Sequence, residues 1–178
     1  FVKEIYVTLY RVASDSHIVN ALISAAKNGK KVTVFVELKA RFDEANNIRW
    51  SKKMKTAGIK IIYSIPGLKV HAKVALVKRQ VQKQWEDYSF MATGNFNEAT
   101  GRFYTDHVFF TSKQEFSSEL AMLFEYLQVR MQPGSYGKIP FKHLLVSQFN
   151  MIKQFDKLIQ REIDNAKKGL PANIIIKL

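Results

Sequence analysis

Cysteine is absent from the 178 residues, and acidic residues are scarce. Without cysteine the chain can form no disulfide, thiol nucleophile or cysteine metal site. Only 15 Asp and Glu accompany 28 Lys and Arg, which gives a net charge of +13. This excess favours an anionic partner, such as nucleic acid, an anionic membrane surface or a phosphate-rich molecule, with a generally basic solvated surface as the alternative.

The chain also lacks several patterns that would assign a function directly. No apolar run approaches the roughly 20 residues of a membrane-spanning helix, and no signal peptide is visible. Nothing reads G-x-x-x-x-G-K-[ST], and no kinase glycine loop or H-R-D triplet occurs. No carboxylate pairs suggest a dedicated Mg²⁺ cage. Any nucleotide chemistry must therefore use another scaffold.

Apolar residues make up 47% of the chain, enough for a sizeable core, and they alternate between strand-like and helical spacing. This order predicts an α/β fold, a mixed sheet flanked by helices, whose first two strands are parallel. Strands are predicted over 2–10, 31–38, 59–63, 67–77, 88–93 and 108–111, with an exposed hairpin connection over 79–87. Helices are predicted after a cap at Asp15 or Ser16, after Asp43, behind residues 112–115, and over 150–166.

The break at residues 132–138 predicts the domain organisation. We expect a first domain over 1–132, a linker over 133–140, and the truncated start of a second domain over 141–178. That second part is predicted to hold strands near 144–146 and 173–178. Because the chain opens and closes in strand-like runs, it is expected to be a fragment of a larger protein.

His71 and Lys73 alternate with apolar residues on the strand predicted over 67–77. Alternation places both side chains on one face, where an imidazole and an ammonium call for an anionic partner, either a structural carboxylate or a phosphate. Arg11 and Arg41 follow the first and second strands, at the sheet edge where functional groups collect in open α/β folds. Two guanidiniums there could clamp a phosphate, or each could pair with a neighbouring carboxylate.

This set of residue types suits phosphoryl transfer. Histidine can act as a nucleophile toward phosphorus and form a phosphoramidate that is then passed on. Lys73, Asn95 and the two arginines would stabilise the oxygens of the transferring group.

The pair His71-Ala72-Lys73, followed by Gly94-Asn95, resembles half of a phospholipase D-type site. That superfamily's pattern, His-x-Lys-x4-Asp, fails here because Lys78 occupies the Asp position. A closer match is the bacterial polyphosphate kinase family, which uses the same fold without that Asp. The stretches similar to this family are 8–13, 36–44, 66–73, 93–98, 104–106 and 141–147.

The resemblance implies that the chain is the first of two phospholipase D-like domains of an ATP:polyphosphate phosphotransferase, with the start of the second. The family moves the terminal phosphate of ATP reversibly onto polyphosphate through a phosphohistidine, here matched by His71, with Lys73 beside it. Tyr104, Asn95 and Asn97 match nucleotide- or phosphate-binding positions.

The resemblance also assigns Arg11 and Arg41 to positions associated with Mg²⁺; a guanidinium cannot ligate a cation, so both are interpreted as phosphate binders near the metal. A second histidine and an arginine of the family's site have no match here, so the isolated chain is expected to be weak or inactive. The family implies a cytoplasmic protein, membrane-associated in some descriptions, oligomeric at full length, with ATP and polyphosphate as partners and no nucleic acid.

Two alternatives stay open from the residues. One is a phospholipase D-type phosphodiesterase or nuclease, with His71 attacking a diester. The other is a non-catalytic polyanion-binding module that rests on the charge of +13.

Overall fold

The computed structural model describes residues 1–38, 40, 43–65, 67–129 and 141–176. The chain divides into two compact units, Phe1–Tyr136 and Gly137–Leu178. The predicted linker over 133–140 lies outside the described residues, so those domain limits stay a prediction. Among the described residues, no helix combines the length and the hydropathy that crossing a membrane requires.

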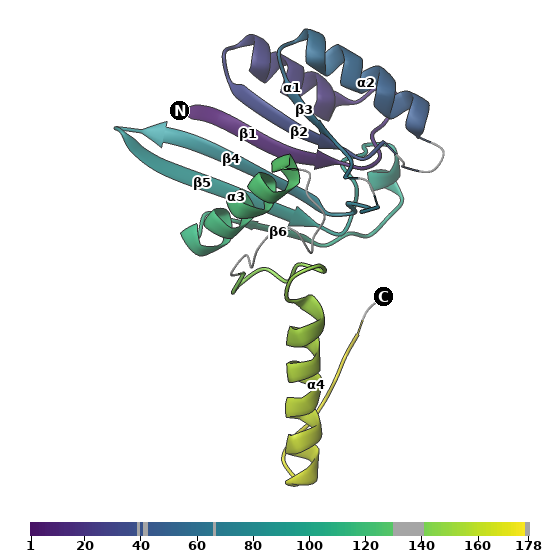
Figure 1. Cartoon of the computed structure of the whole chain (residues 1–178), viewed down its shortest axis with the longest axis vertical. Coiled ribbons are helices and arrows are strands. Elements are labelled where there is room, and N and C mark those ends of the chain that lie inside the picture. The colour runs from purple at the N-terminus through teal and green to yellow at the C-terminus, as the bar shows by residue number, and fades with distance from the viewer. Residues whose placement is uncertain (39, 41–42, 66, 130–140, 177–178) are drawn as a thin grey trace. The chain divides into compact units, whose positions relative to one another are not determined.

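A six-stranded mixed sheet forms the frame of the first unit, in the order β3-β2-β1-β4-β5-β6 (Figure 1). β1 pairs in parallel with β2, and β2 with β3, whereas β4, β5 and β6 are each antiparallel to their neighbours. This confirms the predicted α/β mixed sheet and its parallel first pair. The strands are β1 Val2–Leu9, β2 Lys31–Val36, β3 Lys60–Tyr63, β4 Lys73–Val81, β5 Gln84–Ala92 and β6 Val108–Thr111.

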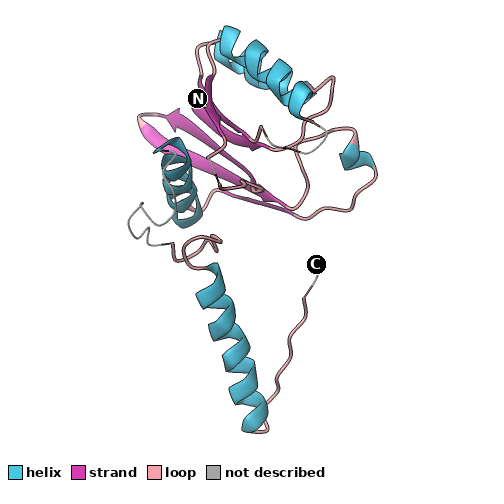
Figure 2. Ribbon diagram, turned by 45° about the vertical axis from the view of Figure 1, so that its right-hand side comes forward, coloured by secondary structure: helices cyan, strands magenta, loops and turns pink. Residues whose placement is uncertain are grey.

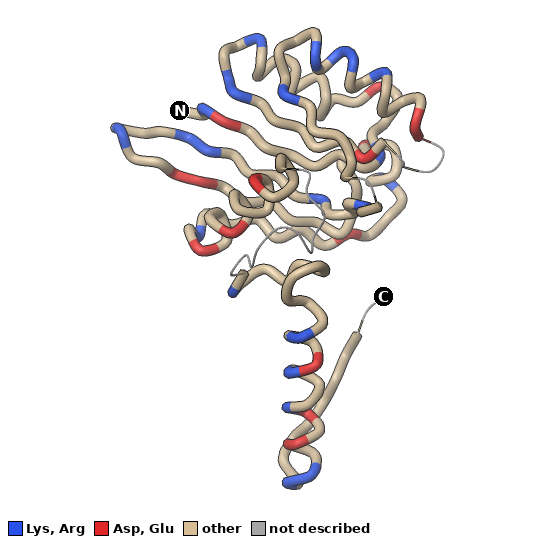
Figure 3. Tube along the Cα trace, in the orientation of Figure 1, with Lys and Arg blue, Asp and Glu red and all other residues tan. Residues whose placement is uncertain are grey.

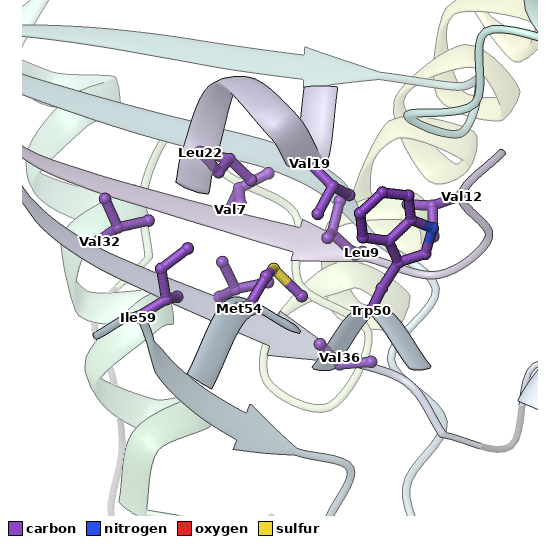
Figure 4. Packing of buried hydrophobic residues seen from close by; sticks show 11 residues of the cluster. Val7, Leu9, Val12, Val19, Leu22, Val32, Val36, Trp50, Met54 and Ile59 are labelled. Carbon is purple, nitrogen blue, oxygen red and sulfur yellow. The ribbon is translucent and has the colours of Figure 1, made fainter. Parts of the chain in front are cut away.

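Helices cover both faces of this sheet (Figure 2). On one face, α1 (His17–Lys27) and α2 (Glu44–Thr56) enclose a core of aliphatic side chains from β1 and β2 together with Trp50 and Met54 (Figure 4). On the other face lies α3 (Gln114–Val129), whose Phe124 ring is 5.5 Å from that of Tyr6. Successive residues of β1 therefore serve opposite layers, as strand alternation requires.

The predicted hairpin is confirmed, but its connection over 79–87 is far shorter in the structure. β4 and β5 continue to Val81 and Gln84, and only Gln82 and Lys83 join them, with φ of 48° and 69°. Left-handed conformations at both turn positions suit the twist of a tight hairpin. The segment is polar because most of its residues are exposed or half-buried, and its two strands carry charges of both signs (Figure 3). Arg79 Nε lies 3.2 Å from Glu86 Oε2 across the hairpin.

The strand predicted over 67–77 begins later, at Lys73. The peptide groups before it bond to side chains instead of to a neighbouring strand. The amide of Val70 donates to Glu37 Oε2 (3.2 Å), and the carbonyl of Ala72 accepts from the hydroxyl of Thr8 (2.7 Å). His71 thus lies in an irregular segment.

The second unit contains α4 (Met151–Lys167), close to the predicted helix. The strand predicted at 144–146 is absent, because Asn150 folds this segment into turns. Its side-chain Nδ2 donates to the carbonyls of Phe141 (3.1 Å) and Leu144 (2.9 Å), and its Oδ1 accepts from the backbone amide of Val146 (2.8 Å). Residues 173–176 are not in a strand either.

Candidate active site

The ends of the six strands bring the candidate residues to one edge of the sheet. Since β4 runs antiparallel to β1, the start of β4 lies beside the carboxyl ends of β1 and β2. The end of β5 and the start of β6 reach the same edge. Arg11 follows β1, His71 precedes β4, Asn95 follows β5 and Asp106 precedes β6. The sheet topology therefore gathers residues far apart in the sequence.

His71 and Lys73 are in direct contact. Lys73 Nζ lies 2.9 Å from His71 Nδ1 and 3.1 Å from Nε2, and it donates to the His71 carbonyl at 2.7 Å. The imidazole is exposed, whereas Lys73 is only 5% exposed. A solvent-accessible imidazole is thus in contact with the ammonium group of a buried lysine.

The surroundings keep the imidazole neutral. Partial burial of the ring, together with the positive charges of Lys73, Lys69 and Arg11, lowers the pKa of His71. Burial and the charge of Arg11 lower the pKa of Lys73 to about 8, and Asp106 opposes this shift. At neutral pH one nitrogen of the neutral imidazole carries a lone pair and the lysine still carries its charge, and nucleophilic attack on a phosphate needs both.

Tyr10 and Lys69 belong to the site, although the sequence analysis assigned them no role. The rings of Tyr10 and His71 meet edge to face, with centroids 4.6 Å apart. Lys69 Nζ lies 5.4 Å from the centroid of the Tyr10 ring. Tyr10 directly precedes Arg11, and Lys69 lies two residues before His71. This closeness in sequence to predicted site residues is the signal that could have identified both.

Arg11 forms an ion pair with a neighbouring carboxylate, which is the alternative that the sequence allowed beside phosphate binding. Its Nε lies 3.1 Å from Asp43 Oδ2. Asp43 stands at the start of α2, yet its side chain makes no capping hydrogen bond there. Arg11 is still close enough to lower the pKa values of His71 and Lys73, so the carboxylate does not remove its field from the site. The other predicted arginine, Arg41, lies outside the described residues.

The segment after β5 carries the other predicted residues, and the structure does not bring them into contact with His71. Asn97 Oδ1 accepts from the amides of Ala99 and Thr100 at 3.0 and 3.1 Å, and so supports the single turn η1 (Thr100–Arg102). Asn95 Oδ1 is buried without a hydrogen-bond partner in the described part of the chain. Tyr104 is 71% exposed.

Asp106 approaches the backbone where β5 ends. Its Oδ1 accepts from the Thr93 hydroxyl at 3.1 Å, and a Cβ at Gly94 would lie only 2.1 Å from its Oδ2. Glycine at position 94 therefore leaves the space that the carboxylate occupies. This placement lets Asp106 act electrostatically on Lys73.

The described residues do not fit a metal held by protein ligands. No group of three or more His, Asp or Glu side chains is arranged for a cation among them. Arg11 has no lone pair to offer a cation, and its nearest carboxylate, Asp43, is ion-paired with it. The site is instead a set of cations around one imidazole, which suits an anionic ligand.

Comparison with known proteins agrees with this reading. The sequence model described as polyphosphate kinase C-terminal domain 1 matches residues 1–133. The chain belongs to the polyphosphate kinase family. A polyphosphate kinase of Vibrio vulnificus strain YJ016 is 44% identical over 177 residues, covering 99% of this chain and 25% of that protein. The Escherichia coli K12 polyphosphate kinase is 43% identical over the same length.

The fold agrees with that of a solved member of the family. The crystal structure of polyphosphate kinase from Porphyromonas gingivalis matches with a TM-score of 0.78 and 46% identity, over 94% of this chain and 27% of that one. The chain thus spans about a quarter of the length of the polyphosphate kinases that it matches. The family membership predicted from the sequence is confirmed.

Proposed function

We propose that this chain supplies the phosphohistidine-bearing part of an ATP:polyphosphate phosphotransferase, with His71 as the nucleophile. The observation that carries the proposal is the exposed imidazole of His71, which has a lowered pKa and rests on the charged Lys73. Family membership supplies the substrate classes, ATP and polyphosphate, because the matching relatives are named polyphosphate kinases.

Two displacements at phosphorus make up the proposed reaction. In the first, the lone pair of a His71 ring nitrogen attacks the terminal phosphorus of ATP, a nitrogen–phosphorus bond forms, and the bond to the bridging oxygen breaks with release of ADP. In the second, a terminal oxygen of polyphosphate attacks the same phosphorus and the nitrogen–phosphorus bond breaks. The chain grows by one phosphate and His71 is regenerated. Each step can run backwards, which accounts for reversibility.

Lys73 has two tasks in this scheme. Its ammonium contacts the histidine ring, where a donated hydrogen bond occupies a lone pair. An arriving phosphate offers the ammonium a stronger, charged acceptor, which frees the nitrogen for attack and places the cation beside the oxygens that gain charge. The described residues provide no group of three or more His, Asp or Glu side chains for Mg²⁺, so an Mg²⁺ ion taking part would be held by the phosphates of ATP.

The remaining predicted residues are assigned by the same proposal. Arg11 and Arg41 bind phosphate oxygens. Asn95 and Asn97 face the nucleotide, and the buried Oδ1 of Asn95 has no hydrogen-bond partner within the described residues. Tyr104 is exposed, and its ring is available to stack on a base.

Labelling with ATP tests the proposal. The encoded full-length polypeptide, incubated with γ-labelled ATP, is expected to carry an acid-labile, base-stable label on the peptide that contains His71. The His71→Ala variant should lose the label, and the matched His17→Ala variant on α1 should keep it. Label that persists in His71→Ala refutes the assignment.

The same preparations separate the proposal from its alternatives. A phosphodiesterase would cleave bis(p-nitrophenyl) phosphate without ATP, and that cleavage would depend on His71. A passive polyanion-binding module would bind polyphosphate with steep salt dependence and would be indifferent to His71→Ala.

A further inference from the structure

We propose that Tyr10 is a positioning residue for His71, whose ring holds the imidazole in place and gathers three cations around it. This inference rests on the proposed function for its catalytic consequence, whereas the geometry that it describes can be tested without ATP.

Tyr10 is itself buried, and its backbone is anchored by a hydrogen bond. It is only 6% exposed, at the point where β1 ends. The Tyr10 carbonyl accepts from Asn47 Nδ2 at 2.9 Å, and the same nitrogen donates to the carbonyl of Glu37 at 3.0 Å. Asn47 is buried on α2, so it ties the ends of β1 and β2 together beneath the site. A residue anchored in this way can orient its neighbours.

Hydrogen bonds hold the backbone on either side of His71, whereas Tyr10 and Lys73 contact its side chain. Glu37 and Thr8 bond to the peptide groups of Val70 and Ala72, on either side of His71. Neither contact restrains rotation of the imidazole. The ring meets Tyr10 at 4.6 Å with an interplanar angle of 79°, a favourable edge-to-face arrangement.

The same ring attracts the surrounding cations. Lys73 Nζ, Lys69 Nζ and Arg11 Cζ lie 5.3, 5.4 and 5.7 Å from its centroid. These groups repel one another, and the negative face of an aromatic ring is an attraction that partly offsets this repulsion. Cations assembled before the substrate arrives need no reorganisation when a phosphoryl group develops charge. Lys69 thereby becomes a further phosphate-binding residue of the site.

Nuclear magnetic resonance of the 178-residue chain tests the geometry directly. In Tyr10→Leu the ring-current displacement of the His71 ring protons should disappear. The pKa of His71 should rise toward its ordinary value, because the imidazole becomes more hydrated and Lys69 and Lys73 are no longer held beside it. Tyr10→Phe keeps the ring and should retain both properties.

A matched control comes from Tyr88 on β5, which also has a guanidinium over its ring, that of Arg79 at 6.0 Å. Tyr88→Leu should leave the His71 signals unchanged. If Tyr10→Leu fails to fold, Lys69→Gln carries the test, since removing this exposed charge should also raise the pKa of His71. Unchanged His71 signals in the folded Tyr10→Leu chain, or an unchanged pKa in Lys69→Gln, overturns the proposal.

The catalytic consequence is measured in the encoded full-length polypeptide. For Tyr10→Leu we expect kcat for phosphohistidine formation to fall roughly 10- to 100-fold, with a much smaller change in KM for ATP, because a misdirected nucleophile reacts slowly while the substrate still binds. Tyr10→Phe should restore kcat. Absence of labelling in the wild type would refute the proposed function, whereas full activity of Tyr10→Leu beside a labelled wild type would refute only the role of Tyr10.

Discussion

Replacing Lys73 with methionine should make the fold more stable and the site inactive. The lysine is almost completely buried at the start of β4, where it contacts His71 and lies close to the Tyr10 ring. Burial and the charge of Arg11 lower its pKa from the ordinary value of 10.5 to about 8. A group whose charged form is disfavoured by folding lowers the stability of the protein wherever it stays charged.

The size of this effect follows from the two pKa values. Between pH 8 and 10.5 the unfolded chain keeps the proton that the folded chain has released, so the wild type gains stability as the pH rises through this window. At about 1.4 kcal/mol for each unit of pKa, the charged lysine costs about 3 kcal/mol at pH 7. The hydrogen bond to the His71 carbonyl returns about 1 kcal/mol. Lys73→Met should therefore stabilise the first unit by about 2 kcal/mol at pH 7.

Urea unfolding followed by tryptophan fluorescence measures the change. Both tryptophans, Trp50 and Trp85, lie in the first unit, so the signal reports on that unit alone. With a slope near 2 kcal/mol per molar urea, the midpoint should rise by about 1 M at pH 7. The advantage of the variant should shrink as the pH approaches 10.5. Lys27→Met, at the exposed end of α1, is the matched control and should follow the wild type at every pH.

Two results would refute this reasoning. If Lys73→Met were less stable than the wild type at pH 7, the contacts of the ammonium would outweigh its desolvation. If the difference between variant and wild type stayed constant from pH 7 to 10.5, the lysine would not titrate near pH 8.

Three further predictions concern the edges of the site. Gly94→Ala should displace the Asp106 carboxylate, since a Cβ there would lie 2.1 Å from its Oδ2, and the pKa of Lys73 should fall further, as measured by ¹⁵N resonance of its Nζ. Thr8→Val should cost about 2 kcal/mol by leaving the partly buried Ala72 carbonyl without its donor, and Thr8→Ser should recover most of this loss in the same urea assay. Lys78→Asp completes the phospholipase D pattern but should create no diesterase activity, because residue 78 lies in the middle of β4; cleavage of a diester by this variant would contradict that.

The sequence was sufficient to predict the α/β sheet, the parallel first strands and the family. The pattern of apolar residues was enough to predict the fold, because a strand buried on both faces, as β2 is, must be almost continuously apolar. The residue types predicted Asp15 or Ser16 as the cap of the first helix, and the structure shows that it is Ser16, whose Oγ accepts from the amide of Val19 at 3.2 Å. Such signals are local, so they can be read without tertiary structure.

Local signals failed where a polar segment had a distant partner. The residues of the β4–β5 hairpin resemble a loop because cross-strand charge pairs, such as Arg79 with Glu86, replace apolar contacts there. The start of β4 was misplaced because Glu37, on the neighbouring chain segment, takes the backbone hydrogen bond that a strand would have used.

For the site, the sequence by itself determined the proposed reactive groups, His71 and Lys73, and their positive surroundings. Only the tertiary structure decided which side chains they contact and how their pKa values shift. The antiparallel entry of β4 beside β1 brings the buried ring of Tyr10 against His71, and burial lowers the pKa of Lys73 to about 8. Both effects arise from the removal of water and from contacts between residues some 60 positions apart, and neither leaves a pattern that can be read along the chain.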